Sequence, residues 1–350
     1  MSEENFRLPM PVISILSFAL TLYAIGLTLY LLARVLFGDR FRLLGLLNNF
    51  TPWYFLPLVI CLPLALLLQE RWLPALMLGL TGAAVAWFGP YYLPHRAKQS
   101  TDDPSLRILT FNIWGDNPCK PELATLFREI NADVVFLQEL PQSFIRNELP
   151  RLLGLYPYQF VPTIEGDWWN NATLSRYPMV ECEGLLTWDI GVPALDRTVI
   201  DVAGRRISAY NAHMRVPFKL SGAGSFLDAV GRALRYDESE RRRLIGKMLD
   251  YLKAERNPYV VAGDFNMSCY SESYHDIANA MVDSFREAGR GFGLTWPHKS
   301  ADTHFSVSLP MLRIDYIWHS RNLTAVEATR QPPFGSDHLP VYATIKLNRI

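Results

Sequence analysis

Gly335-Ser336-Asp337-His338-Leu339-Pro340 lies near the carboxyl end of the chain and precedes a short strand-like run, 341–347. It sets an acid beside a histidine, and both side chains can take part in proton transfer or metal binding. Catalytic side chains gather on loops that a rigid sheet holds in place. Four other polar motifs stand upstream, each at the end of an apolar strand-like run: Thr110-Phe111-Asn112, Leu137-Gln138-Glu139, Gly263-Asp264-Phe265-Asn266 and Arg313-Ile314-Asp315-Tyr316. The five motifs together predict one metal-dependent site for hydrolysing a phosphoester.

Glu139 and Asn112 are the predicted metal ligands. Glu139 follows a fully apolar run, and an unpaired carboxylate buried there would be costly. It therefore either lies in solvent at the strand tip or holds a metal ion. Mg²⁺ takes oxygen ligands from one or two carboxylates, with water and substrate oxygens completing its shell. Asn112 could add an amide oxygen to the metal or donate to the phosphate. The pattern does not separate Mg²⁺ from Mn²⁺.

Asp264 and Asn266 are the predicted phosphate-side pair. They stand two residues apart, so a strand that continues through them would point both side chains to the same face. An acid and an amide on one face, after the small residue Gly263, suit a phosphate beside a cation. The alternative is an ordinary turn at the end of a strand, because Gly, Asp and Asn all favour turns.

His338 is the candidate base, because the near-neutral pKa of histidine lets it take a proton from water. Asp264 is the alternative base. A carboxylate is needed to fix its tautomer, and Asp315 is the best candidate because it interrupts an otherwise apolar run. His213 follows another strand-like run and could donate to the charge that develops on the phosphoryl group. A structural role for His213 is an equal alternative.

Residues 1–98 are predicted to form a membrane anchor with three transmembrane helices, at about 11–36, 52–69 and 72–93. The first run has no charged residue from Pro11 to Ala33, which is long enough to cross a hydrocarbon core of about 30 Å at about 1.5 Å per residue. A secretory signal would instead be one short apolar core with a cleavage site. The expected location is therefore a cell membrane, crossed several times, and the bilayer is an expected partner.

Charge is unevenly divided along the chain. Residues 1–99 contain seven Lys/Arg and four Asp/Glu, which leaves 27 basic and 30 acidic residues and a net charge of about −3 for 100–350. Proteins that grip nucleic acid usually present a basic surface, so a nucleic-acid partner is not favoured. Five of the first seven basic residues would lie on one side of the membrane, which favours a cytoplasmic catalytic domain.

The region 104–350 is predicted to be the catalytic domain, an α/β (α+β) four-layer sandwich of two packed mixed sheets with outer helices. Strand-like runs alternate with helical segments and with a hairpin that turns at Ala203-Gly204. The four cysteines show no disulfide framework and no zinc spacing, so free thiols are expected.

The region 104–350 resembles the endonuclease/exonuclease/phosphatase superfamily, with its deoxyribonuclease I-like fold, because the five motifs occur in the family's order. The resemblance implies a divalent-metal-dependent phosphoester hydrolase. It implies that Asn112 and Glu139 bind the metal and the phosphate, and that His213 lies near the phosphate. Asp264 and Asn266 match the catalytic Asp-x-Asn, and Asp315 matches the acid that orients the histidine. Asp337 and His338 match the terminal catalytic pair, with Asp337 also at the metal. In some relatives the histidine matching His213 pairs with an acid on a preceding strand. Here that neighbourhood is Trp169-Asn170-Asn171-Ala172, with Glu165 and Asp167 nearby but unaligned.

Three spans before such a domain are similar to the membrane-anchored teicoplanin-resistance proteins of bacteria. That likeness implies a lipid-linked phosphate as substrate and a catalytic domain outside the cell, against the charge count, so the side stays open. We expect a phospholipid, sphingolipid or prenyl diphosphate to be hydrolysed by in-line attack of water. The alternatives are a membrane-attached nuclease and, third, a membrane module that binds without catalysis.

Overall fold

The computed structural model describes residues 9–68, 71–93, 104–117, 122–163, 169–218, 231, 235–298 and 309–347. The chain forms two compact units, Met1–Leu93 and Pro94–Ile350. Glu165, Asp167 and Cys119, which entered the sequence-based expectations, lie outside the described residues, as does most of the segment between His213 and Asp237. Cys61, Cys182 and Cys269 are free thiols, as expected.

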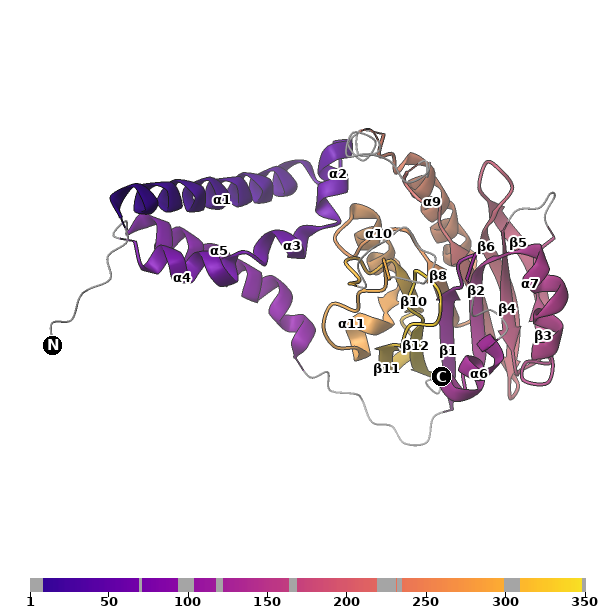
Figure 1. Ribbon diagram of the computed structural model, residues 1–350. Helices are drawn as coiled ribbons and strands as arrows, with labels where there is room; N and C mark the ends of the chain where they lie inside the picture. The colour runs from indigo at the N-terminus through magenta and orange to yellow at the C-terminus, as the bar shows by residue number, and fades with distance from the viewer. Residues whose placement is uncertain are drawn as a thin grey trace, which may run out of the picture. The chain divides into compact units, whose positions relative to one another are not determined.

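The first unit is built of apolar helices (Figure 1). Two segments are long and apolar enough to cross a membrane: α1, and α5 together with the 3₁₀ turn that follows it, Trp72–Tyr92. The predicted second span is not one straight helix, but counting the bent pair of helices between the other two as one span gives three. The helices are α1 (Met10–Phe37), α2 (Arg42–Asn48), α3 (Thr51–Phe55), α4 (Leu58–Leu66), α5 (Trp72–Phe88) and the 3₁₀ helix η1 (Gly89–Tyr92).

A bend separates α2 from the segment that follows it, and hydroxyls of α1 contact that segment. Pro57, between α3 and α4, has no N–H to donate, and α2 meets the segment Thr51–Leu66 at 72°. Backbone polar groups at membrane depth need partners from the protein. The Tyr23 hydroxyl donates to the carbonyl of Tyr54 at 2.8 Å, and the Tyr30 hydroxyl lies 2.7 Å from that of Thr51. Polar groups of α1 therefore support the interrupted helix.

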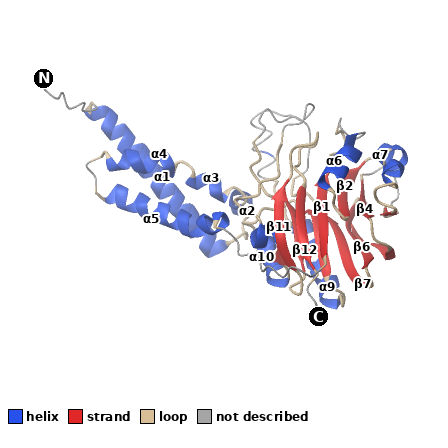
Figure 2. Cartoon of the chain, turned by 90° about the horizontal axis from the view of Figure 1, so that it is seen from below, coloured by secondary structure: helices blue, strands red, loops and turns tan. Residues whose placement is uncertain are grey.

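The second unit contains two six-stranded mixed sheets, as predicted (Figures 1 and 2). In spatial order the first sheet is β11 (Thr324–Arg330), β12 (Val341–Lys346), β1 (Ser105–Asn112), β2 (Val134–Leu140), β4 (Asn170–Ser175) and β3 (Tyr158–Phe160). The second sheet is β5 (Met179–Thr187), β6 (Pro193–Val202), β7 (Arg205–His213), β8 (Tyr259–Asp264), β10 (Asp315–His319) and β9 (Val282–Asp283). The helices are α6 (Leu123–Ile130), α7 (Gln142–Asn147), the 3₁₀ helix η3 (Leu149–Leu152), α9 (Ser239–Ala254), α10 (Glu272–Ala280) and α11 (Ser284–Ala288).

Each sheet contains one parallel pair of strands, β1 with β2 and β7 with β8. The carboxyl ends of a parallel pair meet at the same edge of its sheet. β10 runs antiparallel to β8, and its first residue, Asp315, lies opposite the last residue of β8, Asp264. The topology therefore brings the polar ends of separate strands together.

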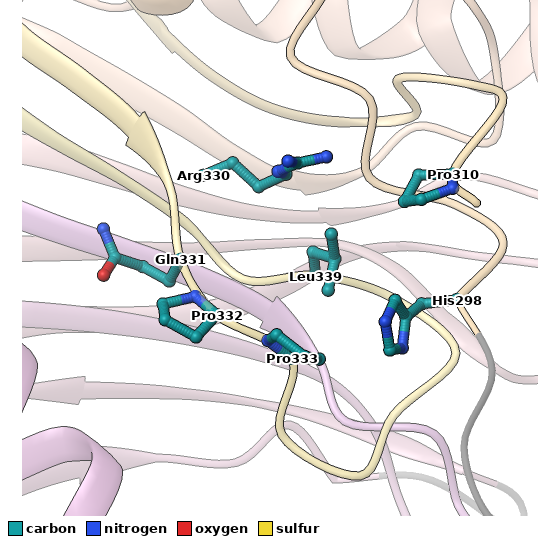
Figure 3. Close-up of a pocket in the computed structure, with 7 residues that line it drawn as sticks. All are labelled: His298, Pro310, Arg330, Gln331, Pro332, Pro333 and Leu339. Carbon is teal, nitrogen blue, oxygen red and sulfur yellow. The ribbon is translucent and has the colours of Figure 1, made fainter. Parts of the chain in front are cut away.

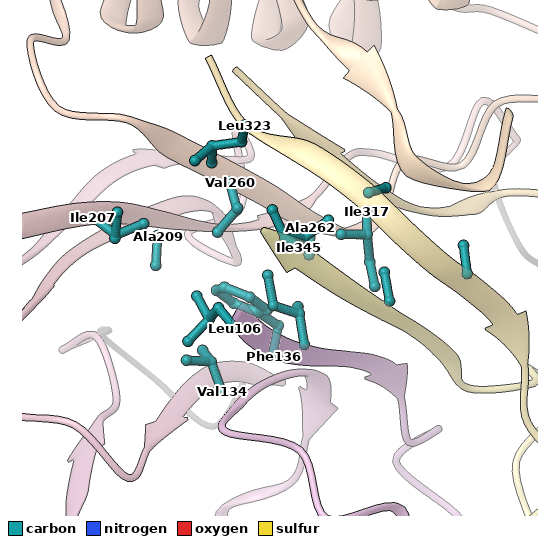
Figure 4. Packing of buried hydrophobic residues seen from close by; sticks show 14 of the residues in the cluster. Leu106, Val134, Phe136, Ile207, Ala209, Val260, Ala262, Ile317, Leu323 and Ile345 are labelled. Atoms are coloured by element: carbon teal, nitrogen blue, oxygen red, sulfur yellow. The ribbon is translucent and has the colours of Figure 1, made fainter. Parts of the chain in front are cut away.

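The core lies between the two sheets. Alternate residues of a strand face opposite sides, and one side of β1 and β2 packs against one side of β7 and β8 (Figure 4). The other side of the first sheet packs on α6, α7 and η3 through a second apolar cluster that includes Leu109 and Phe111. The inward residues that form the central cluster include Leu106, Ile108, Val134, Phe136, Ile207, Ala209, Val260, Ala262 and Ile317.

Candidate active site

The inward-facing row of each central strand changes from apolar to polar at one end. In β1 the row Leu106-Ile108 continues to Thr110 and Asn112, and in β8 the row Val260-Ala262 continues to Asp264, with all of these side chains buried. The same period-two continuation places His213 on β7 and Asp315 on β10 at the inward face. The sandwich therefore delivers buried polar groups from both sheets to one edge of the core.

Asp264 is the centre of this polar group. Its Oδ2 accepts hydrogen bonds from the amide nitrogens of Asn112 and Asn266, both at 3.1 Å, and its Oδ1 accepts from the Asn266 backbone N–H at 2.8 Å. Asn112 also donates to Glu139 Oε1 at 3.0 Å, while its amide oxygen accepts from the Trp114 N–H. Asn112 thus joins the carboxylates of Glu139 and Asp264 through its nitrogen.

Glu139 reaches the site through an unusual backbone conformation. Strand alternation alone would turn it to the outer face, since Phe136 and Gln138 face inward on β2. Its φ is 59°, and the pairing of β2 with β4 shifts register between Leu137 and Leu140. Non-glycine residues in the left-handed region carry strain and cluster at functional sites. The irregularity turns the Glu139 carboxylate toward Asn112.

The Asp264–Asn266 pair comes together differently from the prediction. β8 ends at Asp264, and Asn266 has φ 50°, so no continuing strand puts them on one face. Asn266 instead folds back, and its amide donates to Asp264 and to the Met214 carbonyl. Gly263 is needed because β7 crowds it: its φ is 152°, and a Cβ there would lie 1.8 Å from the Ala212 carbonyl oxygen. Asn266 therefore orients Asp264.

His338 and Asp315 form the predicted pair. Nδ1 of His338 lies 3.0 and 3.1 Å from the two carboxylate oxygens of Asp315, and Nε2 lies 3.8 Å from Asp264 Oδ2. Burial disfavours the charged imidazolium, but the negative charges of Asp315, Asp264 and Asp337 outweigh it and raise the pKa of His338 well above its ordinary value. His338 therefore carries a proton in this arrangement, which makes it a donor.

His213 also lies close to Glu139, with its Nε2 3.7 Å from Glu139 Oε1. Burial lowers its pKa to about 3, and the charge on His338 adds to the effect, so the ring is neutral. Its Nδ1 is buried and has no hydrogen-bond partner among the described residues. The Trp188 ring packs beside it with centroids 4.8 Å apart, and Trp188 Nε1 donates to the His213 carbonyl at 2.8 Å. Trp188 holds this histidine, and no sequence motif pointed to it.

Asp337 lies at the rim of the group. Its Oδ1 is 3.9 Å from His338 Nε2, and its Oδ2 accepts from the Trp296 indole at 3.1 Å. Two clusters have ligand atoms within 4.8 Å of one another, Glu139–His213–Asp264 and Asp264–Asp315–His338, and Asp337 belongs to neither. The role of Asp337 as a metal ligand therefore stays a prediction.

Comparison with known proteins agrees with this geometry. Residues 109–338 match the model of the Endonuclease/Exonuclease/phosphatase family. The chain belongs to this family. Members of the family are metal-dependent phosphoester hydrolases. No curated protein sequence matches the chain.

Several solved structures share the fold of this family at low sequence identity. An endonuclease/exonuclease/phosphatase from Bacteroides vulgatus has 20% identity and a TM-score of 0.54, over 70% of this chain and 100% of that one. TDP2 of Caenorhabditis elegans has 15% identity and a TM-score of 0.53, over 69% and 97%. D. rerio TDP2, complexed with a single-strand DNA product, has 16% identity and a TM-score of 0.54, over 70% and 100%.

The donor set fits the divalent metal of the family. Burial is the main cause that raises the pKa of Glu139, to about 7, and it also raises the pKa of Asp264. None of the carboxylates of Glu139, Asp264, Asp315 and Asp337 forms an ion pair with Lys or Arg within the described part of the chain. These four carboxylates face one protonated imidazole, that of His338, so negative charge is in excess, which favours a bound cation. Glu139 and Asp264 are the better placed pair, because Asp315 is already bonded to His338.

Buried amides connect the two sheets beneath the site. Gln138 Nε2 donates to Asn211 Oδ1 at 2.7 Å, and Asn211 donates to the carbonyls of Leu137 and Ala172. Next to them Asn171 donates to Asp196 Oδ2 at 2.8 Å, whereas Asp196 Oδ1 is buried without a partner among the described residues. Burial raises the pKa of Asp196 to about 7. Asp196 was not singled out from the sequence, although it interrupts an apolar strand.

We expect Asp196→Asn to stabilise the protein at pH 8 and to have little effect near pH 4. The folded state keeps the Asp196 proton up to about pH 7, whereas the unfolded chain releases it near pH 4, so the wild-type carboxyl lowers stability progressively as pH rises through that window. The shift corresponds to about 2–4 kcal/mol at pH 8. Thermal unfolding of the full chain in detergent at both pH values measures it.

Asp250→Asn is the control, because Asp250 is exposed on α9 and forms an ion pair with the nearby Lys253. It should leave the melting temperature unchanged at both pH values. An Asp196→Asn protein that is no more stable than wild type at pH 8 would show that Asp196 is ionised without cost in the folded state.

Proposed function

We propose that this protein is a membrane-anchored, divalent-metal-dependent phosphoester hydrolase that acts on a lipid-linked phosphate, such as a phospholipid, sphingolipid or prenyl diphosphate. The observation that carries the proposal is the buried group of carboxylates around His338 and His213. It combines ligands for a hard cation with two imidazoles that can face a phosphoryl group. Family membership supports the same class of reaction.

A bound Mg²⁺ or Mn²⁺ would be held by Glu139 and Asp264, with Asp337 near it, and would polarise a phosphoryl oxygen. Asp264 also takes the proton from the attacking water, for which a carboxylate oxygen within the site is a suitable acceptor. Asn112 and Asn266 keep Asp264 oriented for that step.

The two histidines stabilise the transferring group. His338, oriented by Asp315 and protonated, donates from Nε2 to an oxygen that gains negative charge. His213 donates as a neutral imidazole from its Nε2 side, which faces Glu139. Donors that are already in place and buried stabilise developing charge most effectively. In this proposal Asp264 is the base and His338 is a donor.

The substrate class follows from the anchor. A site tethered at a bilayer meets lipid head groups at a high effective concentration, and the first unit contains two or three helices apolar enough to cross a membrane. The second candidate is a membrane-attached nuclease, because one structural neighbour, D. rerio TDP2, was solved with a single-strand DNA product. The net charge of about −3 in residues 100–350 weighs against it, because nucleic-acid binding depends on basic contacts.

Activity of the full chain in detergent micelles tests the proposal. Phosphate or alcohol release is measured on phospholipids, a sphingolipid, a prenyl diphosphate, nucleotides and DNA. We expect turnover of at least one lipid phosphate, loss of that turnover with EDTA, and recovery on adding Mg²⁺ or Mn²⁺. The metal should also raise the melting temperature, because a ligand that binds only the folded state stabilises it.

The same assay separates the alternatives. Cleavage of DNA without cleavage of any lipid phosphate would select the nuclease. Binding of lipid without turnover of any substrate, with or without metal, would select a binding module and overturn the proposed function. Turnover that EDTA leaves unchanged would contradict the metal assignment.

A further inference from the structure

A pocket of about 360 Å³ is lined in part by Leu339 (Figure 3). Leu339 is part of its wall and follows His338 directly in the chain, so their Cα atoms are about 3.8 Å apart. The remaining wall comes from Arg330 at the end of β11, from the three residues that follow it, and from His298 and Pro310. The pocket is therefore next to the proposed active site and separate from the residues that form it.

Backbone hydrogen bonds fix the walls of the pocket to the active-site loop. The His298 N–H donates to the Asp337 carbonyl at 2.7 Å, and the Leu339 N–H donates to the Thr295 carbonyl at 2.9 Å. On the other side the Gln331 N–H donates to the Pro340 carbonyl at 2.8 Å. A ligand in the pocket would therefore be held at a defined position relative to His338.

The lining combines one cation with apolar rings. Arg330 donates from Nη1 to the Leu294 carbonyl at 2.9 Å, which fixes the guanidinium while leaving further N–H groups for a ligand. Pro310, Pro332 and Pro333 supply rigid apolar surface around it. An arginine fixed in this way suits a phosphate or a carboxylate, which its planar fork can bind through two hydrogen bonds.

We propose that this pocket binds a second anionic group of the substrate, a phosphate or carboxylate joined to the scissile phosphoester by a short linker that packs on the prolines. The inference rests on the proposed function, because it takes the phosphoester at His338 as the point of attachment. It narrows the substrate class to phosphoesters with two anionic groups. Arg330 is then a specificity-determining residue.

Calorimetric titration of the full chain in detergent, with Mg²⁺ in excess, tests this inference. The probes are n-propyl phosphate and 1,3-propanediol bisphosphate, which differ by one phosphate. Wild type should bind the bisphosphate about tenfold or more tightly, the gain expected for one charge-assisted contact. Arg330→Gln should remove most of that preference, and Arg330→Lys, which keeps the charge without the fork, should retain part of it.

Arg321→Gln is the matched control, because Arg321 is another exposed arginine that donates to backbone carbonyls, those of Ala278 and Asn279. It follows β10 at the end opposite Asp315 and should leave the preference unchanged. Equal affinities of wild type for the two probes, or a preference that Arg330→Gln leaves intact, would overturn the inference. Hydrolysis of bis(p-nitrophenyl) phosphate, measured separately, tests the proposed function alone.

Discussion

Glu139→Gln is expected to lower kcat/KM for phosphoester hydrolysis about a thousandfold, the largest loss we expect from an isosteric substitution. The glutamine keeps the shape of the side chain and can still bond to Asn112, but it removes one of the two carboxylates that are best placed to hold the metal. Hydrolysis of the best substrate of the panel, at saturating Mg²⁺, measures the loss. Calorimetric titration with Mg²⁺ should show weaker metal binding as well.

A stability measurement distinguishes this loss from misfolding. Burial raises the pKa of Glu139 to about 7, so at pH 8 the ionised carboxyl lowers the stability of the metal-free protein. Glu139→Gln should therefore melt at the same or a higher temperature without metal, and should gain less when Mg²⁺ is added. Glu148→Gln, on the surface pair with Arg151, is the matched control and should behave as wild type. Retention of wild-type Mg²⁺ affinity in Glu139→Gln would refute the metal assignment.

Much of the site followed from sequence because strand alternation is local. Asn112 and Asp264 continue rows of apolar residues that face the core, so an apolar run followed by a polar residue was enough to place them at a strand end. Asp315 was found for the same reason, as an acid in an otherwise apolar strand. The family resemblance then ordered these motifs into one site.

The features that the sequence did not predict depend on contacts between distant segments. Glu139 and Asn266 reach the site through positive φ values, which residue type alone does not indicate. Trp188, in the turn between β5 and β6, meets His213 at the end of β7, and Asp196 meets Asn171 from the other sheet. Such partners are set by how the two sheets pack, and no short motif records them.

In the membrane unit, too, local sequence predicted some features, and contacts between distant segments determine the others. Apolar length predicted the first and third spans, because crossing a bilayer requires about 20 apolar residues whatever their neighbours. The second span is bent between α2 and α3, and hydroxyls of Tyr23 and Tyr30 on α1 contact the segment after the bend. The length of an apolar run indicates whether a segment can cross a bilayer, but it does not indicate whether the segment is straight or bent.

Asp315→Asn is expected to reduce kcat by a factor on the order of a hundred to a thousand, the loss typical when one donor to a developing negative charge is weakened or removed. Asp315 accepts from Nδ1 of His338 and supplies the main charge that keeps His338 protonated. An amide in its place removes that charge, so His338 loses its extra proton and its Nε2–H becomes the weaker donor of a neutral imidazole. The pH dependence of kcat on the best lipid substrate gives the decisive reading.

Without the Asp315 charge, the pKa of His338 falls, so the residual activity of Asp315→Asn should decline at a lower pH than that of wild type. Misfolding would lower activity at every pH and would not move the profile. Asp196→Asn changes another buried aspartate of the same sheet and should keep both the activity and the pH profile of wild type. If Asp315→Asn showed the wild-type profile with a uniformly lower rate, His338 would not be the proton-bearing group, and the donor to the phosphoryl oxygen would have to be sought at His213.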